Sequence, residues 1–207
     1  MLLDMIISIA SRKGGVGKTV TAIHLAAYIE QTAGLGTTLL VDADPNRSAM
    51  GWSERGELPF AVVPEAKSQK YARDYEHIVI DTQGRPESQQ LEDIVDGCDL
   101  LIIPCMADAL SLDALLYTVD EIEMLGRTDG YKVLLTSVQP PPVRSGQQAR
   151  QQLEGLNVPL FKNDIRRREA FQKAANQGVP VYAVKDRRAR QGWDDYQQVG
   201  HEVWRPE

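Results

Sequence analysis

Short apolar runs rich in β-branched residues alternate along the chain with longer segments of helical period. The runs at 5–10, 37–41, 77–80, 100–103 and 133–135 are nearly all apolar, as expected for strands buried on both faces. Apolar residues recur at helical spacing in the segments 19–31, 87–95, 111–125 and 147–156. This alternation predicts stacked βαβ units and an α/β fold, with a doubly wound, mainly parallel sheet flanked by helices. Ligands of such sheets bind at the carboxyl ends of the strands.

Length and composition narrow the class of protein. The 207 residues suit a single domain spanning 1–207, and 43% hydrophobic with 25% charged residues excludes a disordered chain. Because no apolar stretch reaches about 20 residues and Asp4 makes the start acidic, we expect a soluble, cytoplasmic protein. Cys98 and Cys105 are too few for a disulfide framework and lack metal-ligand spacing, so we expect both to be small core residues.

A glycine-rich loop follows the first predicted strand and precedes a predicted helix. Residues 11–19 read Ser-Arg-Lys-Gly-Gly-Val-Gly-Lys-Thr. Glycines let successive N–H groups point inward, and the helix N-terminus adds partial positive charge, so the loop can cradle phosphates. Lys18 would contact the β- and γ-phosphates and Thr19 would ligate Mg²⁺. The alternative is a glycine-rich turn with lysines for solubility, which the flanking strand and helix disfavour.

The loop departs from the usual G-x-x-x-x-G-K-[ST] pattern, because Arg12 stands where the first glycine would be and Lys13 adds a second lysine. Its Lys-Gly-Gly-x-Gly-Lys-Thr sequence resembles the ParA/MinD family of deviant Walker-A P-loop ATPases, closest to the small partition ATPases without an N-terminal helix-turn-helix domain. The resemblance runs from about residue 5 to 204. It implies ATP and Mg²⁺ as cofactors and an ATP-sandwiched dimer in which Lys13 reaches the partner's nucleotide. The implied nucleotide-binding residues are Lys13, Gly14, Gly15, Val16, Gly17, Lys18, Thr19 and Val20.

Carboxylates follow two of the predicted strands. Hydrolysis of a nucleoside triphosphate needs a metal ion and a group that orients the attacking water, and such carboxylates could supply both beside the loop. The segment Val-Asp-Ala-Asp-Pro-Asn at 41–46 resembles a family motif in which Asn46 replaces glutamine, and 78–82 resembles the Walker-B strand. The resemblance assigns Lys13, Lys18 and Asp44 to catalysis, with Asp44 at the water. It assigns Mg²⁺ to Thr19, Asp42 and Asp81.

Simpler roles remain open for these carboxylates. Asp42 and Asp44 could be turn residues before Pro45, and Asp81 could cap a helix or turn. At 83–86 the chain has Gln-Gly-Arg-Pro where the family usually has further prolines. The three histidines have no nucleophile beside them, and we expect His24 to be packed or partly exposed.

A basic segment near the C-terminus contrasts with the acidic chain. Residues 161–190 carry a net charge of +6, whereas the whole chain carries −6. Such a segment can bind phosphates without reading sequence, or it can simply be a solvated surface. Partition ATPases bind nucleoid DNA through C-terminal basic residues, so the resemblance implies a DNA-binding set of Arg166, Arg167, Arg168, Lys173, Arg187, Arg188 and Arg190.

Together these features predict an ATP-dependent partition or positioning ATPase. ATP would drive dimerisation and non-specific DNA binding on the nucleoid, and a centromere-binding or cargo adaptor would stimulate the weak hydrolysis that releases plasmid or chromosome DNA. Alternatives are positioning of a protein cargo on the nucleoid, a MinD-like membrane ATPase and a metabolic P-loop ligase. The acidic end at 193–207 disfavours a membrane partner, because anionic lipid would repel it.

Overall fold

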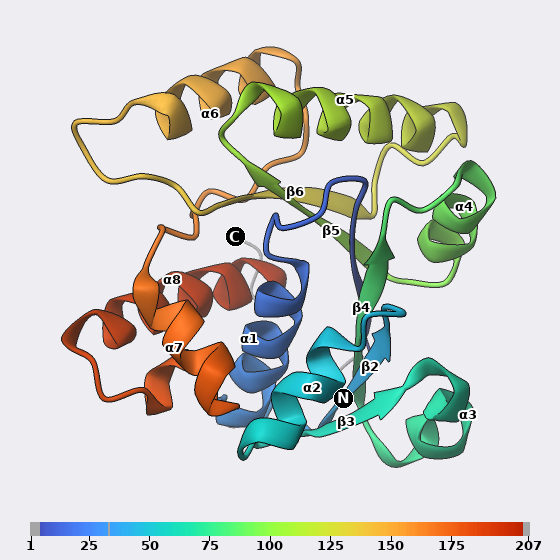
Figure 1. Cartoon of the computed structure of the whole chain (residues 1–207). Helices are drawn as coiled ribbons and strands as arrows, with labels where there is room; N and C mark the ends of the chain where they lie inside the picture. The colour runs from blue at the N-terminus through green and yellow to red at the C-terminus, as the bar shows by residue number, and fades with distance from the viewer. Residues whose placement is uncertain (1–4, 33, 205–207) are drawn as a thin grey trace.

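The computed structural model describes residues 5–32 and 34–204, which build a six-stranded sheet with helices on both faces (Figure 1). The strand order is β3-β2-β4-β1-β5-β6, and every neighbouring pair is parallel. The predicted doubly wound α/β fold is therefore confirmed. The strands are β1 (Met5–Ser11), β2 (Thr38–Ala43), β3 (Ala61–Pro64), β4 (His77–Gly84), β5 (Leu100–Met106) and β6 (Tyr131–Thr136).

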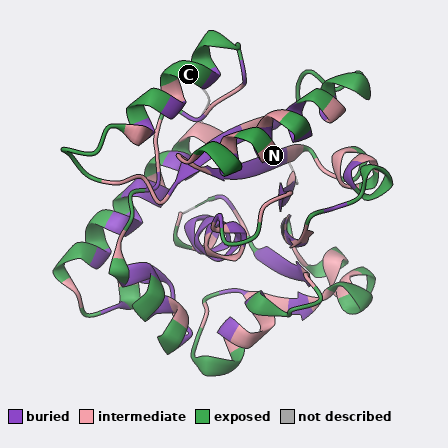
Figure 2. Ribbon diagram, turned by 45° about the horizontal axis from the view of Figure 1, so that its top comes forward, coloured by how far each residue is buried: buried purple, intermediate pink, exposed green. Residues whose placement is uncertain are grey.

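Two layers of helices cover the sheet and bury separate apolar cores. Alternate strand residues face opposite layers, so Ile102 packs in one core while Leu101 and Ile103 pack in the other. Figure 2 shows the buried residues concentrated in the strands and in α1. One layer holds α1 (Lys18–Gln31), α2 (Ser48–Arg55), α7 (Glu169–Gln177) and α8 (Arg187–Trp204). The other holds α3 (Ser68–Tyr71), α4 (Ser88–Asp96), α5 (Ala109–Met124) and α6 (Ser145–Gly155).

All five predicted strands and all four predicted helices are present, with ends shifted by a few residues. The sequence analysis did not name β3, α2, α3, α7 or α8. β3 is a four-residue edge strand paired only with β2 and ends in Pro64, so its pattern is short. Cys105 is buried as expected, whereas Cys98 is only half-buried. Within 5–32 and 34–204, no helix has the length and apolar character needed to cross a membrane.

The C-terminal segment is fixed to the rest of the fold at two places. Single parallel bridges join Val133 to Leu160 and Val138 to Arg166, so this segment runs beside β6 and beyond its end. On the other side, α8 packs along α1, where the Tyr196 ring stacks on His24 with centroids 4.7 Å apart. These contacts set the basic segment next to the carboxyl edge of the sheet.

Candidate nucleotide site and basic groove

The phosphate loop has the backbone that its glycines predict. Gly15 and Gly17 have φ values of 79° and 92°, a left-handed conformation that glycine adopts without strain. Gly17 directly precedes α1, so the first N–H groups of that helix open toward the loop. Thr136 at the end of β6 donates its hydroxyl hydrogen to the Val16 carbonyl at 2.7 Å. The loop is thus shaped as an anion cradle and held against the sheet.

Lys18 and Thr19 enter the site from the first turn of α1. Lys18 is buried, and its ammonium lies beside the end of β4, 3.5 Å from the point where a Cβ on Gly84 would be. The Thr19 hydroxyl donates to Asp81 Oδ2 at 2.7 Å. Val20 follows in the same turn, and its side chain packs against the core. Gly14 lies in an exposed part of the loop with open space around it.

Asp81 is completely buried near the end of β4, opposite Asp42 of β2 in the sheet register. Burial raises the pKa of Asp81 to about 7, and the nearby charge of Asp42 acts in the same direction. Asp81 Oδ1 has no hydrogen-bond partner within residues 5–32 and 34–204. A buried carboxylate oxygen without a partner is costly unless a cation is supplied. The residues here therefore fit a divalent cation.

Asp42 makes one contact of the turn type that the sequence analysis left open and a second contact, to α2, that it did not assign. Its Oδ2 accepts the Met50 N–H at 2.8 Å and its Oδ1 accepts the Asp44 N–H at 3.2 Å, so it fixes the segment between β2 and α2. Asp44 is half-buried on that segment, and its Oδ1 accepts both the backbone N–H of Asn46, at 2.8 Å, and its side-chain amide, at 2.9 Å. Asn46 thereby orients the Asp44 carboxylate, which is a use for the residue that replaces glutamine.

Lys13 forms an ion pair at the start of α5. Its ammonium pairs with Asp108 Oδ1 at 2.8 Å. Asp108 is the N-cap of α5, because it accepts the Ser111 N–H at 3.0 Å and the Ser111 hydroxyl at 2.6 Å. The hydrogen bonds from Lys13 and Ser111 lower the pKa of Asp108. The sequence analysis missed Asp108, although an aspartate three residues before a serine at a helix start is a recognisable cap.

Hydrogen bonds join the segment 83–86, which departs from the family pattern, to two other elements. Arg85 has a φ of 59°, and its N–H donates to the Ser11 carbonyl at 3.2 Å. Gln83 donates its side-chain amide to Gln90 of α4 at 2.7 Å. The end of β4 is thus tied to both the start of the phosphate loop and α4.

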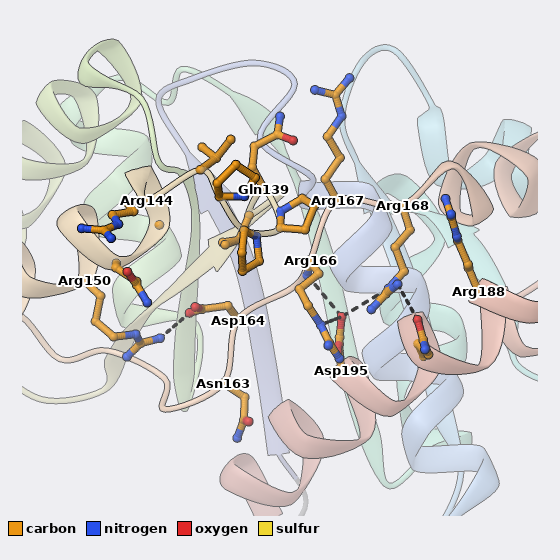
Figure 3. A pocket seen from close by; sticks show the side chains of 18 of the residues that line it. Gln139, Arg144, Arg150, Asn163, Asp164, Arg166, Arg167, Arg168, Arg188 and Asp195 are labelled. Atoms are coloured by element: carbon orange, nitrogen blue, oxygen red, sulfur yellow. Dashed lines mark hydrogen bonds and ion pairs between the residues drawn. The ribbon is translucent and has the colours of Figure 1, made fainter.

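A groove of about 1330 Å³ lies beyond the end of β6. Val138, two residues after the Thr136 that contacts the phosphate loop, forms part of its wall, so the groove adjoins the nucleotide site. Figure 3 shows arginines from three parts of the chain around it. They are Arg144 and Arg150, then Arg166, Arg167 and Arg168, and finally Arg188.

Two of the predicted DNA-binding arginines are held by an ion pair with a buried carboxylate. Arg166 and Arg168 both pair with Asp195, a buried carboxylate of α8 (Figure 3). Arg167 and Arg188 are exposed, and neither guanidinium has an ion-pair partner among the described residues. The four arginines line the groove together.

The remaining predicted DNA contacts lie outside the groove wall. Lys173 pairs with Asp186 at 2.5 Å, while Arg187 and Arg190 are exposed on the first turn of α8. The structure thus gathers Arg166, Arg167, Arg168 and Arg188 in the groove, and Lys173, Arg187 and Arg190 on the neighbouring surface. Asp195, which orients two of the groove arginines, was not singled out from the sequence; no pattern in the segment marks it.

The chain matches known proteins over nearly its whole length. Residues 7–181 match the family described as the CobQ/CobB/MinD/ParA nucleotide binding domain. The "Maintenance of carboxysome distribution protein A" of Gloeobacter kilaueensis is 33% identical over 210 residues, 97% of this chain and 95% of the relative. "Protein ParA" of Rhizobium radiobacter is 28% identical over 173 residues, 77% of this chain and 74% of the relative.

A solved structure agrees with the fold. The ATP complex of Cyanothece McdA superposes with a TM-score of 0.72 at 17% identity, covering 97% of this chain and 96% of that one. The similarity expected from the two-lysine loop is confirmed by these matches. The chain therefore belongs to the CobQ/CobB/MinD/ParA family of nucleotide binding domains.

Proposed function

We propose that this protein is a cargo-positioning ATPase whose ATP-bound dimer holds non-specific DNA and whose hydrolysis, stimulated by a partner, releases it. ATP and Mg²⁺ are its cofactors: the family binds nucleotides, and the solved relatives include an ATP complex and a Mg-ADP complex. The observation that carries the proposal is that the two loop lysines have different partners. Lys18 lies in the cradle, whereas Lys13 is bound by Asp108 at α5. A second lysine that is not used in its own cradle fits a role on a partner subunit's nucleotide.

The acidic residues support the same reaction. Thr19 and Asp81 would hold Mg²⁺, with Asp42 beside them, and the ion would neutralise phosphate charge. Asp44 stands at the end of the neighbouring strand β2, where Asn46 orients it, and would position the attacking water. Lys18 would compensate the charge of the β- and γ-phosphates. These assignments place each role on a side chain at the carboxyl edge of the sheet.

The basic groove supports DNA as the surface on which the dimer is held. Arg167 and Arg188 have unpaired guanidinium groups among the described residues, while Arg166 and Arg168 are kept in position by Asp195. Such arginines bind phosphates regardless of base sequence. A dimer would double the contacts, and linked contacts gain affinity through effective concentration. DNA binding would then depend on ATP without any change within a subunit, and the protein would gather on the nucleoid.

The cargo follows from the relatives rather than from the site. A relative with 33% identity over 97% of the chain is named for carboxysome distribution, and another is a ParA protein. The first relationship favours a large protein body as the cargo, and the second favours plasmid or chromosome DNA. An adaptor on the cargo would be the partner that stimulates hydrolysis.

The test measures the mass of the protein in solution and its binding to unrelated DNA duplexes, each with ADP and with a slowly hydrolysed ATP analogue. ATP turnover is measured with and without DNA and with and without anionic liposomes. We expect a dimer and DNA binding only with the ATP analogue, and no dependence on liposomes. A protein that remains monomeric with the analogue, or that needs liposomes or a small substrate for turnover, would contradict the proposal.

A further inference from the structure

Helix α5 exposes apolar side chains at a regular spacing. Leu110, Tyr117 and Met124 are 73%, 56% and 86% exposed, and they follow one another at intervals of seven residues. Seven residues are close to two helical turns, so the three side chains lie in one stripe. Large apolar side chains scattered singly are ordinary, but three that align on one face of a helix, with carboxylates between them, favour a contact surface. We call this stripe, with the acidic residues beside it, the α5 face.

The α5 face is acidic. Four carboxylates, Asp113, Asp120, Glu121 and Glu123, lie on α5, and this helix has no lysine or arginine. The adjacent α4 adds Glu92, Asp93 and Asp96, again with no basic residue. Figure 1 shows both helices on the opposite side of the sheet from α7 and α8, which carry the basic segment. The surface of α4 and α5 is therefore mainly acidic, although Arg12 pairs there with Glu121 and Arg127 with Asp96, and α7 and α8 lie on the other side of the sheet.

This charge pattern selects the occupant. DNA and anionic lipid would be repelled by the carboxylates, and a second copy meeting the same face symmetrically would oppose like charges. A segment with apolar residues at helical spacing and lysines or arginines beside them complements both the stripe and the carboxylates. We propose that the α5 face is a docking surface for a basic amphipathic helix of a partner protein.

The α5 face also contacts the phosphate loop directly. The Arg12 guanidinium lies over the Tyr117 ring, 4.9 Å from its centroid, and forms an ion pair with Glu121. Ser88 of α4 donates to the other oxygen of the Glu121 carboxylate at 2.7 Å. A docked basic segment covers Tyr117 and competes for Glu121, so it changes the contacts that hold Arg12, the residue next to Lys13. This link rests on the proposed function, because partner-stimulated hydrolysis is the event that it would transmit.

The test of docking uses a labelled synthetic helix of 16 residues, the length of α5, made of leucine at helical spacing and lysine elsewhere. A leucine and glutamate peptide of the same pattern is the charge control. Fluorescence anisotropy is measured without nucleotide, so the result does not depend on ATPase activity. We expect the lysine peptide to bind and the glutamate peptide not to bind.

Variants locate the binding. Two double variants should each lower the affinity for the lysine peptide by about tenfold or more. Leu110→Ser with Met124→Ser removes apolar burial, and Asp113→Lys with Asp120→Lys removes charge attraction. These side chains are exposed, so the fold should persist. Leu156→Ser removes an exposed leucine after α6 and is the matched control. Equal binding by all variants, or no binding by the unmodified protein, would overturn the docking proposal. Loss of a self-associated species in the α5 variants without peptide would identify a second copy as the occupant.

The link to the loop is tested with Arg12→Ala. We expect this variant to bind the lysine peptide within about twofold of the unmodified protein, while the peptide no longer alters ATP turnover. If the peptide leaves turnover unchanged in the unmodified protein, docking stands and the link through Arg12 is wrong. If the protein binds the peptide but does not hydrolyse ATP at all, the proposed function is wrong while the docking surface stands.

Discussion

Titration of His24 should lower the free energy of unfolding by about 2 kcal/mol between pH 7.5 and pH 5, and replacement of His24 by glutamine should abolish this loss. His24 is fully buried on α1, and its ring stacks on Tyr196 of α8, the helix that carries the groove residue Arg188. Its Nδ1 lies 2.6 Å from the Val20 carbonyl, and its Nε2 accepts the Val181 N–H at 3.0 Å. The ring is therefore neutral with its proton on Nδ1, because a proton on Nε2 would point at another N–H. The histidine joins the nucleotide helix to the C-terminal segment only in this form.

The magnitude follows from the shift in pKa. Burial lowers the pKa of His24 from 6.5 to about 4, against the Val20 hydrogen bond, which raises it. Between these values the unfolded chain binds a proton that the folded protein does not, so stability falls as the pH falls. The full effect below pH 4 is about 3 kcal/mol, of which about 2 kcal/mol is lost by pH 5.

The measurement must be a difference between two proteins. Asp81, with its raised pKa, changes stability in the opposite direction over the same range, since the folded protein takes up its proton first as the pH falls. Asp81 is present in both the unmodified protein and the His24→Gln variant, so its contribution cancels in the difference. Urea unfolding, followed by tryptophan fluorescence at several pH values, gives the free energy of unfolding of each protein.

The unmodified protein should be more stable than His24→Gln at pH 7.5, and this advantage should shrink by about 2 kcal/mol at pH 5. The variant His201→Gln replaces an exposed histidine of α8 and controls for loss of a histidine as such. A difference that stays constant with pH would refute the reasoning. So would a His24 ring that titrates near 6.5 by NMR, because that ring would have to be open to water.

The site residues give three further predictions. Lys13→Ala should fold and still bind some nucleotide but should lose the ATP-dependent dimer, as measured by light scattering with a slowly hydrolysed ATP analogue. A normal dimer would show that Lys13 is not needed at the partner subunit's nucleotide. Asp44→Ala should keep nucleotide affinity and lose turnover, whereas Lys18→Ala should lose productive binding; wild-type turnover in Asp44→Ala would mean that another residue positions the water. Replacing both Arg167 and Arg188 by alanine should weaken binding to unrelated duplexes alike and reduce the salt slope by about two per subunit in gel shifts. Arg127→Ala, on the acidic side, controls for loss of an arginine outside the groove.

The sequence predicts the sheet and the cradle well because their signals are local. The last five residues of the central strand β1 are all buried, and β4 alternates buried with half-buried residues, so both strands contain short apolar runs. The loop glycines and the lysine and threonine after them are adjacent in the chain, and their positive φ values follow from the same residues. For such features the pattern and the geometry carry the same information.

Long-range pairs could not be predicted in this way. Asp195 is one aspartate in a polar helix, and only the fold brings it to Arg166 and Arg168, 29 and 27 residues earlier in the chain. Asp108 pairs with Lys13 across 95 residues. Asp42, which was assigned to Mg²⁺ with a turn role as the alternative, also fixes the start of α2 through Met50. His24 was expected only to be packed or partly exposed. Its two ring nitrogens in fact contact Val181, 157 residues away, and Val20, four residues away. These roles depend on which elements meet, and the pattern along the chain does not contain that information.

The contacts of α5 make docking and dimerisation interdependent. Asp108 and Glu121, one at each end of this helix, hold Lys13 and Arg12, so a dimer that takes Lys13 to another subunit's nucleotide must break an ion pair made by α5. By linkage, a basic segment that raises the dimerisation constant by some factor must bind the dimer more tightly than the monomer by the same factor. A segment that lowers the dimerisation constant must bind the dimer more weakly. The affinity of the lysine peptide should therefore differ between the ADP and ATP-analogue states, and Asp108→Asn, which weakens the hold on Lys13, should reduce that difference. Equal affinities in the two states, with the dimer formed, would show that the α5 face is energetically separate from the nucleotide.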